Sequence, residues 1–274
     1  MWFKENNPGH RFEAGLVAAM AAVAPEDVVV PIAVDRGRGW LLAEDHGATL
    51  SHAEVADQRV RCVVVRALAR LQCALLGRLE PGGILEVHPG GAGDRVRGVV
   101  RAWAGLAAGH PLRVADDVLK LVESAADVLD RRAGSLSGVV PLDVEINDVY
   151  PANIFADRST GTLRTRFFDF GNAVWGHPFV SLHGFLDSVV EWTCAPLPHA
   201  DRETLYDVYL KVWSDHLGAD PRLLRNDLRT TGALLSVHRL LSWQRLIPYA
   251  DPLEISARAE IPLKYLSGVA ALGR

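Results

Sequence analysis

Residues 147–171 decide the fold: they read Asn-Asp-Val-Tyr-Pro-Ala-Asn-Ile-Phe, then a short polar turn, then Arg-Phe-Phe-Asp-Phe-Gly. Asp148 lies five residues before Asn153, and a second apolar run ends in Asp169, which Phe-Gly follows. Two carboxylates and an amide at the ends of short strands are typical of a phosphoryl-transfer site. We expect Asp148 to accept the proton of a substrate hydroxyl. Asn153 and Asp169 are expected to hold magnesium on the phosphates of a nucleotide.

The order and spacing of these residues decide between a site and a chance arrangement. An Asp five residues before an Asn is common in loops, and so is Asp-Phe-Gly in a turn. Here the two occur in order, 169 − 148 = 21 residues apart, beside apolar strand-like pieces. This combination favours the functional interpretation over that of three unrelated loop residues.

The composition is that of an ordinary globular protein. The chain has 274 residues, of which 49% are hydrophobic and 23% are charged, with a formal net charge of −4. No long basic run indicates a nucleic-acid partner, and no run of about 18 apolar residues indicates a membrane span. The first residues lack the apolar segment of a secretion signal, so we expect a cytoplasmic protein. Cys62, Cys73 and Cys194 predict neither a disulfide framework nor a metal site.

The pattern of apolar and turn residues predicts an α+β fold with two lobes, at residues 1–46 and 47–274. A capping box at Ser51 is expected to open a helix that runs to Leu76, and the glycine-rich residues 80–97 are expected to form an irregular loop. The other expected helices are at 11–23, 114–132, 180–192, 200–217, 221–246 and 255–272; the expected strands are at 2–4, 28–34, 40–42, 139–144, 153–156 and 163–168.

The motifs carry a resemblance to a known family. Residues 145–155 and 167–178 are similar to the aminoglycoside phosphotransferase superfamily, which includes choline kinase-like enzymes and has the protein kinase fold. Its catalytic loop usually reads His-x-Asp-x-His-x-x-Asn, and its magnesium loop reads Asp-(Phe/Trp/Leu)-Gly. Asp148, Asn153 and Asp169 match. The resemblance implies a two-lobed kinase-like fold with a truncated N-terminal lobe and a mostly helical C-terminal lobe, a catalytic Asp148, and metal-binding Asn153 and Asp169.

The resemblance extends upstream to an expected nucleotide site. Lys4 ends a strand similar to the one whose Lys contacts the ATP phosphates, and Glu13 opens a helix similar to the one whose Glu pairs with that Lys. Residues 40–47 resemble the family's hinge, whose backbone near Ala43 and Glu44 would bind adenine. The implied cofactors are Mg²⁺ and ATP, with GTP as the alternative. On the residues alone, a frayed terminal Lys4 and a solvated Glu13 stay open as the other interpretation.

The sequence departs from the family pattern at supporting positions. Ile146 and Tyr150 stand where catalytic-loop histidines are usual, and His177 replaces the Asp of a Gly-Asp-Pro that follows the magnesium loop. His177, beside the magnesium loop, is the histidine with the strongest case for function, although a structural role is the more ordinary interpretation. The chain also begins at the Lys strand, so the two preceding strands and the glycine-rich loop have no counterpart. We expect the true start to lie upstream, in preference to a natural fragment or a partner that supplies these strands.

The sequence thus predicts an ATP- and Mg²⁺-dependent phosphotransferase that acts on a hydroxyl of a small-molecule acceptor, aminoglycoside-like or another alcohol. The alternative is a catalytically impaired pseudokinase or nucleotide-binding relic, because of Ile146, Tyr150 and the missing glycine-rich loop. A kinase that acts on protein is less favoured, since a helix is expected soon after the magnesium loop. Asp187 and Glu191 share a helix face and could bind a cationic acceptor, although a solvated face is the more ordinary interpretation. The sequence predicts neither the acceptor's identity nor the oligomeric state.

Overall fold

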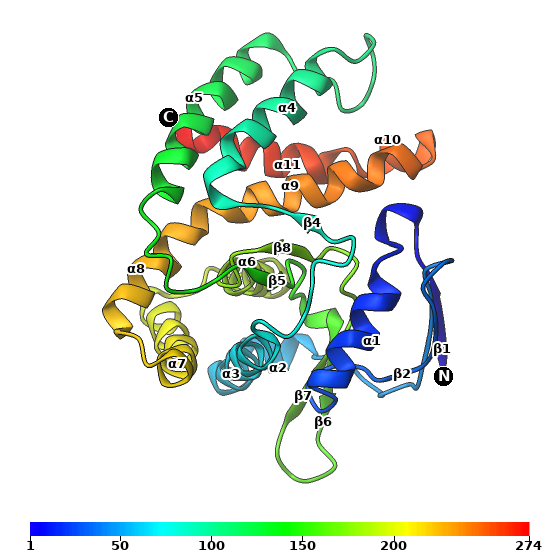
Figure 1. The fold of residues 1–274 in the computed structure, drawn as a ribbon, viewed down its shortest axis with the longest axis vertical. Coiled ribbons are helices and arrows are strands. Elements are labelled where there is room, and N and C mark those ends of the chain that lie inside the picture. Colours follow the sequence, from blue (N-terminus) through cyan, green and yellow to red (C-terminus); the bar gives the residue numbers. More distant parts are fainter. Residues whose placement is uncertain (274) are drawn as a thin grey trace.

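The N-terminal lobe is a three-stranded antiparallel sheet with one long helix beside it (Figure 1). In the computed structural model, which describes residues 1–273, the strand order is β1-β3-β2. Gly39 closes the β2–β3 hairpin with a positive φ of 74°, and its N–H donates to the carbonyl of Asp35 at 2.8 Å. The expected hairpin is therefore confirmed. The elements are β1 Trp2–Glu5, α1 Glu13–Val23, β2 Pro31–Asp35 and β3 Trp40–Ala43.

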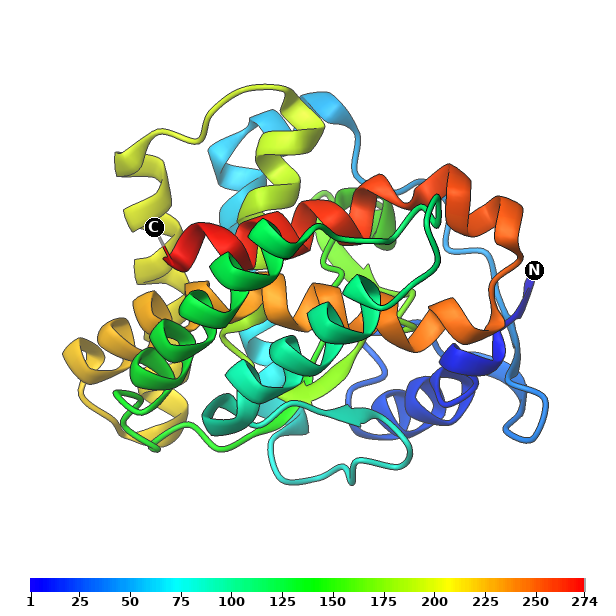
Figure 2. The ribbon, with the colours of Figure 1, turned by 90° about the horizontal axis from the view of Figure 1, so that it is seen from above.

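The C-terminal lobe is mainly helical and is built in two layers (Figures 1 and 2). Helix α3 packs on α7 in one layer, and α4, α5, α9 and α11 pack together in the other. The helices are α2 His52–Ala56, α3 Gln58–Leu75, α4 Ala92–Ala104, α5 Asp116–Ala133, α6 Val180–Thr193, α7 His199–Leu217, α8 Pro221–Thr231, α9 Leu235–Leu246, α10 Pro252–Arg258 and α11 Glu260–Ala270.

The strands β4, β8 and β5 lie between these helical layers, and the β6-β7 hairpin projects from the lobe beside α2 (Figure 1). One sheet has the order β4-β8-β5, and the other is the hairpin β6-β7. Residues 146–153 connect β5 to β6 and contain the predicted catalytic residue, so they are called the catalytic loop. Residues 168–173 connect β7 to β8 and contain the predicted metal ligand Asp169, so they are called the magnesium loop. The strands are β4 Leu85–Glu86, β5 Asp143–Glu145, β6 Ile154–Asp157, β7 Arg164–Phe167 and β8 Val174–Gly176.

Three of the expected helices are each divided in two. Asp57 has extended backbone angles of −78° and 121°, and its side chain accepts the N–H of Arg59 at 2.8 Å, so it ends α2 and caps α3. A 3₁₀ turn at Gly232–Leu234 separates α8 from α9, and Ala259 separates α10 from α11. The apolar periodicity continues across each break, which is why periodicity alone predicted single helices.

The loop expected at residues 80–97 is wrong in its second half, because α4 begins at Ala92. The glycines that suggested a loop have a packing role. Gly93 donates its N–H to Asp130 at 3.1 Å, and a Cβ at Gly93 would lie 2.5 Å from that carboxylate. Glycine therefore lets α4 approach α5 closely.

The catalytic loop is anchored between two apolar cores. Ile146 and Val149 belong to the core of α3 and α7, whereas Val174, Val237 and Leu240 belong to the core of α4, α5, α9 and α11. The loop is thus fixed on one side by its own apolar side chains and lies close to α9 on the other. Among the helices of residues 1–273, none has both the length and the apolar character needed to cross a bilayer.

Candidate active site

Lys4 brings together three parts of the chain that are far apart in sequence. Its Nζ lies 2.7 Å from Glu13 Oε2 at the start of α1 and 2.8 Å from Asp169 Oδ1 in the magnesium loop. The Phe170 N–H donates to Glu13 Oε1 at 2.9 Å. The structure therefore places the expected Lys–Glu pair together, and Glu13 also holds the backbone of the magnesium loop.

Burial and charge oppose each other in this pair. Burial raises the pKa of Glu13, although the Lys4 ammonium partly offsets this effect. Burial alone would lower the pKa of Lys4, but Glu13 and Asp169 outweigh it, so that pKa lies above its ordinary value. The charged ammonium is thus held between two carboxylates at the edge of the N-terminal lobe.

The conformation of the magnesium loop explains its Asp-Phe-Gly sequence. Asp169 has a φ of 63°, in the left-handed region that non-glycine residues rarely adopt. Phe170 is fully buried and anchors the loop in the core. A Cβ at Gly171 would lie 2.7 Å from His10 Nδ1 and 3.1 Å from Glu13 Oε2, so only glycine fits there. Packing on α1 therefore stabilises an otherwise strained loop.

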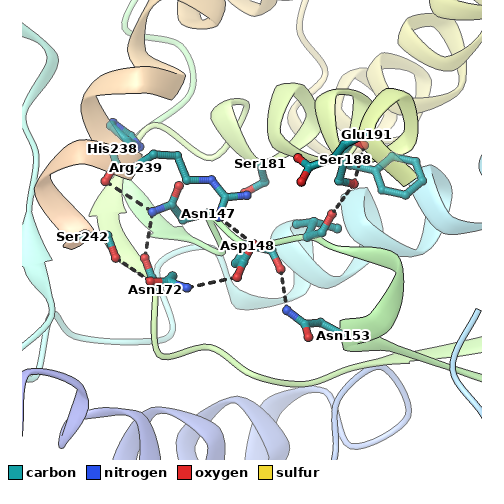
Figure 3. Close-up of polar contacts among 12 residues, drawn as sticks. Asn147, Asp148, Asn153, Asn172, Ser181, Ser188, Glu191, His238, Arg239 and Ser242 are labelled. Atoms are coloured by element: carbon teal, nitrogen blue, oxygen red, sulfur yellow. Dashed lines mark hydrogen bonds and ion pairs between the residues drawn. The ribbon is translucent and has the colours of Figure 1, made fainter. Parts of the chain in front are cut away.

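Asp148 extends from the catalytic loop, and both of its carboxylate oxygens accept hydrogen bonds (Figure 3). Arg239 Nη1 of α9 lies 2.6 Å from Oδ1, and Asn172 Nδ2 of the magnesium loop lies 3.0 Å from Oδ2. Asn153 Nδ2 donates to the backbone carbonyl of Asp148 at 3.3 Å. This bond uses the amide nitrogen of Asn153 and leaves its oxygen as the atom suited to a cation.

A cavity of about 640 Å³ lies in front of these residues. Asp148, Asn153 and Asp169 all line it, so the structure brings the three predicted residues to one space. Two carboxylates of α6, Asp187 and Glu191, line the same cavity. Its wall also includes Glu260, Arg239, Lys264, Tyr150, Trp243 and Tyr265.

The donor set of this cavity fits magnesium. No three His, Cys, Asp or Glu side chains gather as a metal cluster within residues 1–273. Magnesium on a nucleotide needs only one or two protein ligands, because phosphates and waters complete its octahedron. Asp169 and Asn153, which line one cavity, supply a carboxylate and an amide oxygen for such an ion.

An apolar cluster lies beside the expected hinge. Val29, Ala43 and Phe155 are buried together, and Phe168 packs against them. Phe155 and Phe168 stack with ring centroids 4.3 Å apart. Ala43 ends β3 fully buried, whereas Glu44 is exposed. The cluster has the flat, apolar character that an adenine ring would need.

His177, the histidine singled out from the sequence, is a buried structural residue. It is 3% exposed, and its Nδ1 accepts the N–H of Phe179 at 3.3 Å, just before α6. Burial, followed by the nearby imidazoles of His238 and His183, lowers the pKa of His177 to about 3, so its ring is neutral at physiological pH.

Sequence reasoning missed several residues that contact the catalytic loop. Asn172 and Arg239 hold Asp148, and Glu145 accepts the N–H of Asn147 at 2.7 Å. Asn172 lay inside a quoted motif, but its partner is 24 residues away in sequence. Arg239 lies in α9, within the helix expected at 221–246, and its partner Asp148 is 91 residues away in sequence. No local pattern indicates contacts of this kind.

Comparison with known proteins gives matches in structure only. No protein-family model matches the sequence, and no curated protein does. An ethanolamine kinase from Plasmodium vivax superposes with a TM-score of 0.64 at 11% identity, over 97% of this chain and 74% of that chain. The choline kinase LicA from Streptococcus pneumoniae superposes with a TM-score of 0.61 at 13% identity, over 98% of this chain and 85% of that chain.

A third match is the gentamicin-APH(2")-IIa complex, with a TM-score of 0.54 at 10% identity, over 99% of this chain and 86% of that one. At such identities the likeness shows the fold. This chain has the α+β, two-lobed, kinase-like fold of these proteins, and the fold class predicted from the sequence is confirmed. The first two of these neighbours are named as ethanolamine and choline kinases, and the sequence motifs resemble a group that includes choline kinase-like enzymes.

Proposed function

We propose that this chain is an ATP-dependent phosphotransferase that moves a γ-phosphoryl group to a hydroxyl of a small molecule. The observation that carries this proposal is the meeting of Asp148, Asn153 and Asp169 around one cavity, beside the Lys4–Glu13 ion pair. Phosphoryl transfer depends on positioning and on charge neutralisation, and these groups are suited to both tasks.

Each residue has a proposed role that follows from its chemistry. Asp148 orients the acceptor hydroxyl and takes its proton, since its carboxylate lines the cavity and is held by two donors. Asn153 and Asp169 hold Mg²⁺, which neutralises phosphate charge when bound. Lys4 meets the phosphates of the nucleotide, because Glu13 fixes its ammonium beside Asp169.

The nucleotide is proposed to lie between the lobes at residues 1–46 and 47–274. The apolar cluster of Val29, Ala43 and Phe155 supports this position for the adenine, with backbone hydrogen bonds at Ala43 and Glu44. ATP is proposed as the donor and GTP as the alternative. Competition between the two nucleotides for the purified protein would decide which base the hinge prefers.

The acceptor is proposed to be a small alcohol that carries a positive charge. Asp187 and Glu191 of α6 and Glu260 of α11 line the cavity together with Asp148. Lys264 offsets part of this charge by pairing with Glu191 at 3.6 Å, yet carboxylates outnumber the cations of the wall. Choline, ethanolamine and gentamicin, named with the structural neighbours, are alcohols of this kind and are suitable first candidates.

A catalytically impaired pseudokinase is the competing proposal. It is favoured by Ile146 and Tyr150, which stand where the family that the sequence resembles usually has histidines. The position of Tyr150 supports activity instead, because it lines the acceptor cavity and leaves Asp148 accessible there.

The experiment combines nucleotide binding with turnover. Calorimetry with Mg-ATP, and phosphate-transfer assays with choline, ethanolamine, gentamicin and neutral alcohols, are run on the same preparation. Binding and transfer to a cationic alcohol are expected. Binding of Mg-ATP without transfer to any alcohol would favour the pseudokinase. Transfer to neutral alcohols alone would contradict the proposal that the acceptor carries a positive charge.

A further inference from the structure

Helix α9 lies beside the catalytic loop and directs His238, Arg239 and Ser242 toward it (Figure 3). Family loops usually carry a supporting histidine where this chain has Ile146, which is 2% exposed and packed in the apolar core. An isoleucine side chain has no hydrogen-bonding group. The polar support of the loop must therefore come from other residues, and α9 contributes three of them.

His238 of α9 supports the loop through Glu145. Its Nδ1 lies 3.0 Å from Glu145 Oε2, and both side chains are fully buried. Glu145 Oε1 accepts the N–H of Asn147 at 2.7 Å and the hydroxyl of Ser181 at 2.9 Å. The backbone carbonyl of His238 also accepts Asn147 Nδ2, at 3.4 Å. The side chain and the carbonyl of His238 thus fix the residue that precedes Asp148.

Asn147 needs this support because its backbone is strained. Its φ of 59° lies in the left-handed region, and the residue is fully buried. A non-glycine residue keeps such a conformation only where the surrounding contacts over-determine it. Asn147 donates its N–H to Glu145 and its side-chain amide to the carbonyls of His238 and Asn172, the latter at 2.9 Å, and these bonds provide the contacts. The resulting turn directs Asp148 toward the cavity.

Arg239, the next residue of α9, holds the side chain of Asp148. Its Nη1 lies 2.6 Å from Asp148 Oδ1, and its side chain is only 11% exposed. Gly184 of α6 makes room for this arrangement, since a Cβ there would lie 3.0 Å from the carbonyl of Asn147 and 3.7 Å from Arg239 Nη2. The close approach of α6 to the loop thus depends on one glycine, whereas the 3.7 Å to Arg239 is an ordinary van der Waals distance.

Ser242, one helical turn after His238, completes the contact. Its hydroxyl donates to Asn172 Oδ1 at 2.8 Å, and Asn172 Nδ2 donates to Asp148 Oδ2 at 3.0 Å. Each oxygen of Asp148 is therefore fixed by a donor that belongs to α9 or is oriented by it (Figure 3).

We infer that His238 and Arg239 are positioning residues, which set the backbone and the carboxylate of Asp148 for proton transfer in place of the histidine that family loops carry. This inference rests on the proposed function. Both residues act through Asp148, and neither is required to touch the nucleotide. Their contacts place the Asp148 carboxylate, in addition to any general contribution they make to stability.

The test compares disruptive and conservative variants at the two positions. His238→Leu removes the imidazole contact with Glu145 and leaves the backbone carbonyl in place, and Arg239→Met removes the contact with Asp148. His238→Asn keeps a donor near the position of Nδ1. We expect kcat to fall about 100-fold in the first two variants with little change in the KM for Mg-ATP, because misplacing a reacting group by about 1 Å costs this much. His238→Asn should recover much of kcat, and free guanidinium should partly rescue Arg239→Ala.

Matched controls separate positioning from stability. His183→Asn removes a buried imidazole of α6 that contacts the carbonyl of Leu228 at 2.7 Å, and Arg225→Met removes an ion pair of α8 with Glu203, also 2.7 Å long. Neither of the altered residues lines the cavity. Both controls should lower thermal stability and leave kcat within about twofold of wild type.

Hydrogen exchange of the peptide that contains Asn147 gives a readout independent of turnover. Its N–H should exchange faster in His238→Leu than in His183→Asn, because only the first change loosens Glu145. Equal loss of kcat in the variants and their controls, or unchanged exchange at Asn147, would overturn the inference. If wild type transfers no phosphoryl group, the proposed function fails, and the exchange measurement alone decides whether α9 positions the loop.

Discussion

Lys4 and Glu13 form an ion pair of 2.7 Å that joins the first strand to the first helix and places an ammonium 2.8 Å from Asp169. Only nine residues separate the two in sequence, yet they come from different elements. The Glu13 side chain is fully buried, whereas that of Lys4 keeps 27% of its surface exposed. The buried Glu13 carboxylate therefore depends on the Lys4 ammonium to neutralise its charge.

Lys4→Met should abolish turnover and lower stability, because it leaves the Glu13 carboxylate buried without a cation. The loss should be smaller than the about 3–5 kcal/mol of a fully buried pair, since Lys4 is partly exposed. The double variant Lys4→Met/Glu13→Gln should recover stability and remain inactive. Thermal unfolding and a phosphate-transfer assay measure the two effects. Recovery of activity in the double variant would contradict the proposed role of Lys4 in binding the nucleotide phosphates.

Replacing Asp148 should impair catalysis, whereas replacing Asp169 should impair magnesium-dependent nucleotide binding. Asp148→Asn should keep Mg-dependent nucleotide binding and lose about 10²- to 10⁴-fold in kcat, the range for a general base. Asp169→Asn should lose the magnesium dependence of binding, since it removes the anionic ligand. Calorimetry with ATP, in the presence and absence of Mg²⁺, separates the two variants. Identical binding by both would contradict the assigned roles.

The motif residues could be predicted from the sequence because their signal is local. Asp148, Asn153 and Asp169 stand in short runs whose order and spacing are informative, and the structure brings them to one cavity. Lys4 and Glu13 came from the family resemblance, and the structure pairs them. The roles of these five residues stay predictions.

The support of the catalytic loop could not be predicted from the sequence. Arg239 meets Asp148 across 91 residues, and His238 meets Glu145 across 93. Such contacts depend on how α9 packs against the strands, which no local pattern determines. The helix breaks at Asp57 and Gly232 were missed for a related reason, because capping contacts and turns end helices whose apolar periodicity continues.

Gly171→Ala should destabilise the protein by about 1–3 kcal/mol, the usual cost of overpacking. The new Cβ would lie 2.7 Å from His10 Nδ1 and 3.1 Å from Glu13 Oε2, so the magnesium loop must shift. Gly98→Ala is the control: it lies in α4 with nothing within 4 Å of the new Cβ, and it should stabilise by up to about 1 kcal/mol. Urea unfolding of both variants measures the contrast. An equal effect at the two sites would contradict the packing argument.

Ile146→His should not raise activity, although histidine is usual at this position in the family that the sequence resembles. Ile146 is 2% exposed in an apolar core, so a histidine there would bury polar nitrogens at a cost of about 1–3 kcal/mol. Ile146→Val, which removes one methylene, should cost about 0.5–1.5 kcal/mol. Chemical unfolding and kcat are measured for both variants. A gain in kcat for Ile146→His would mean that α9 does not supply the loop's support.

Stability should fall in mild acid, and His177 should account for part of the loss. Its pKa is lowered to about 3 in the folded protein, against an ordinary 6.5, mainly by burial. The unfolded chain therefore binds one more proton than the folded chain in the window between these values. Above pH 6.5 the ring is neutral in both the folded and the unfolded chain, so His177 lowers stability only below this pH. As the pH falls from 6.5 toward 3, the free energy of unfolding decreases by up to about 1.4 kcal/mol per pH unit.

His177→Asn isolates this contribution. Its side-chain oxygen can accept the N–H of Phe179 as the imidazole does, but it does not titrate. Between pH 6 and pH 4, the free energy of unfolding should fall less steeply in this variant than in wild type, by about 1 kcal/mol per pH unit. Urea unfolding across this range measures both slopes. Equal slopes in wild type and His177→Asn would contradict the prediction, because they would mean that His177 binds a proton equally well in the folded and unfolded chains. Its burial, at 3% exposure, should make proton binding weaker in the folded chain.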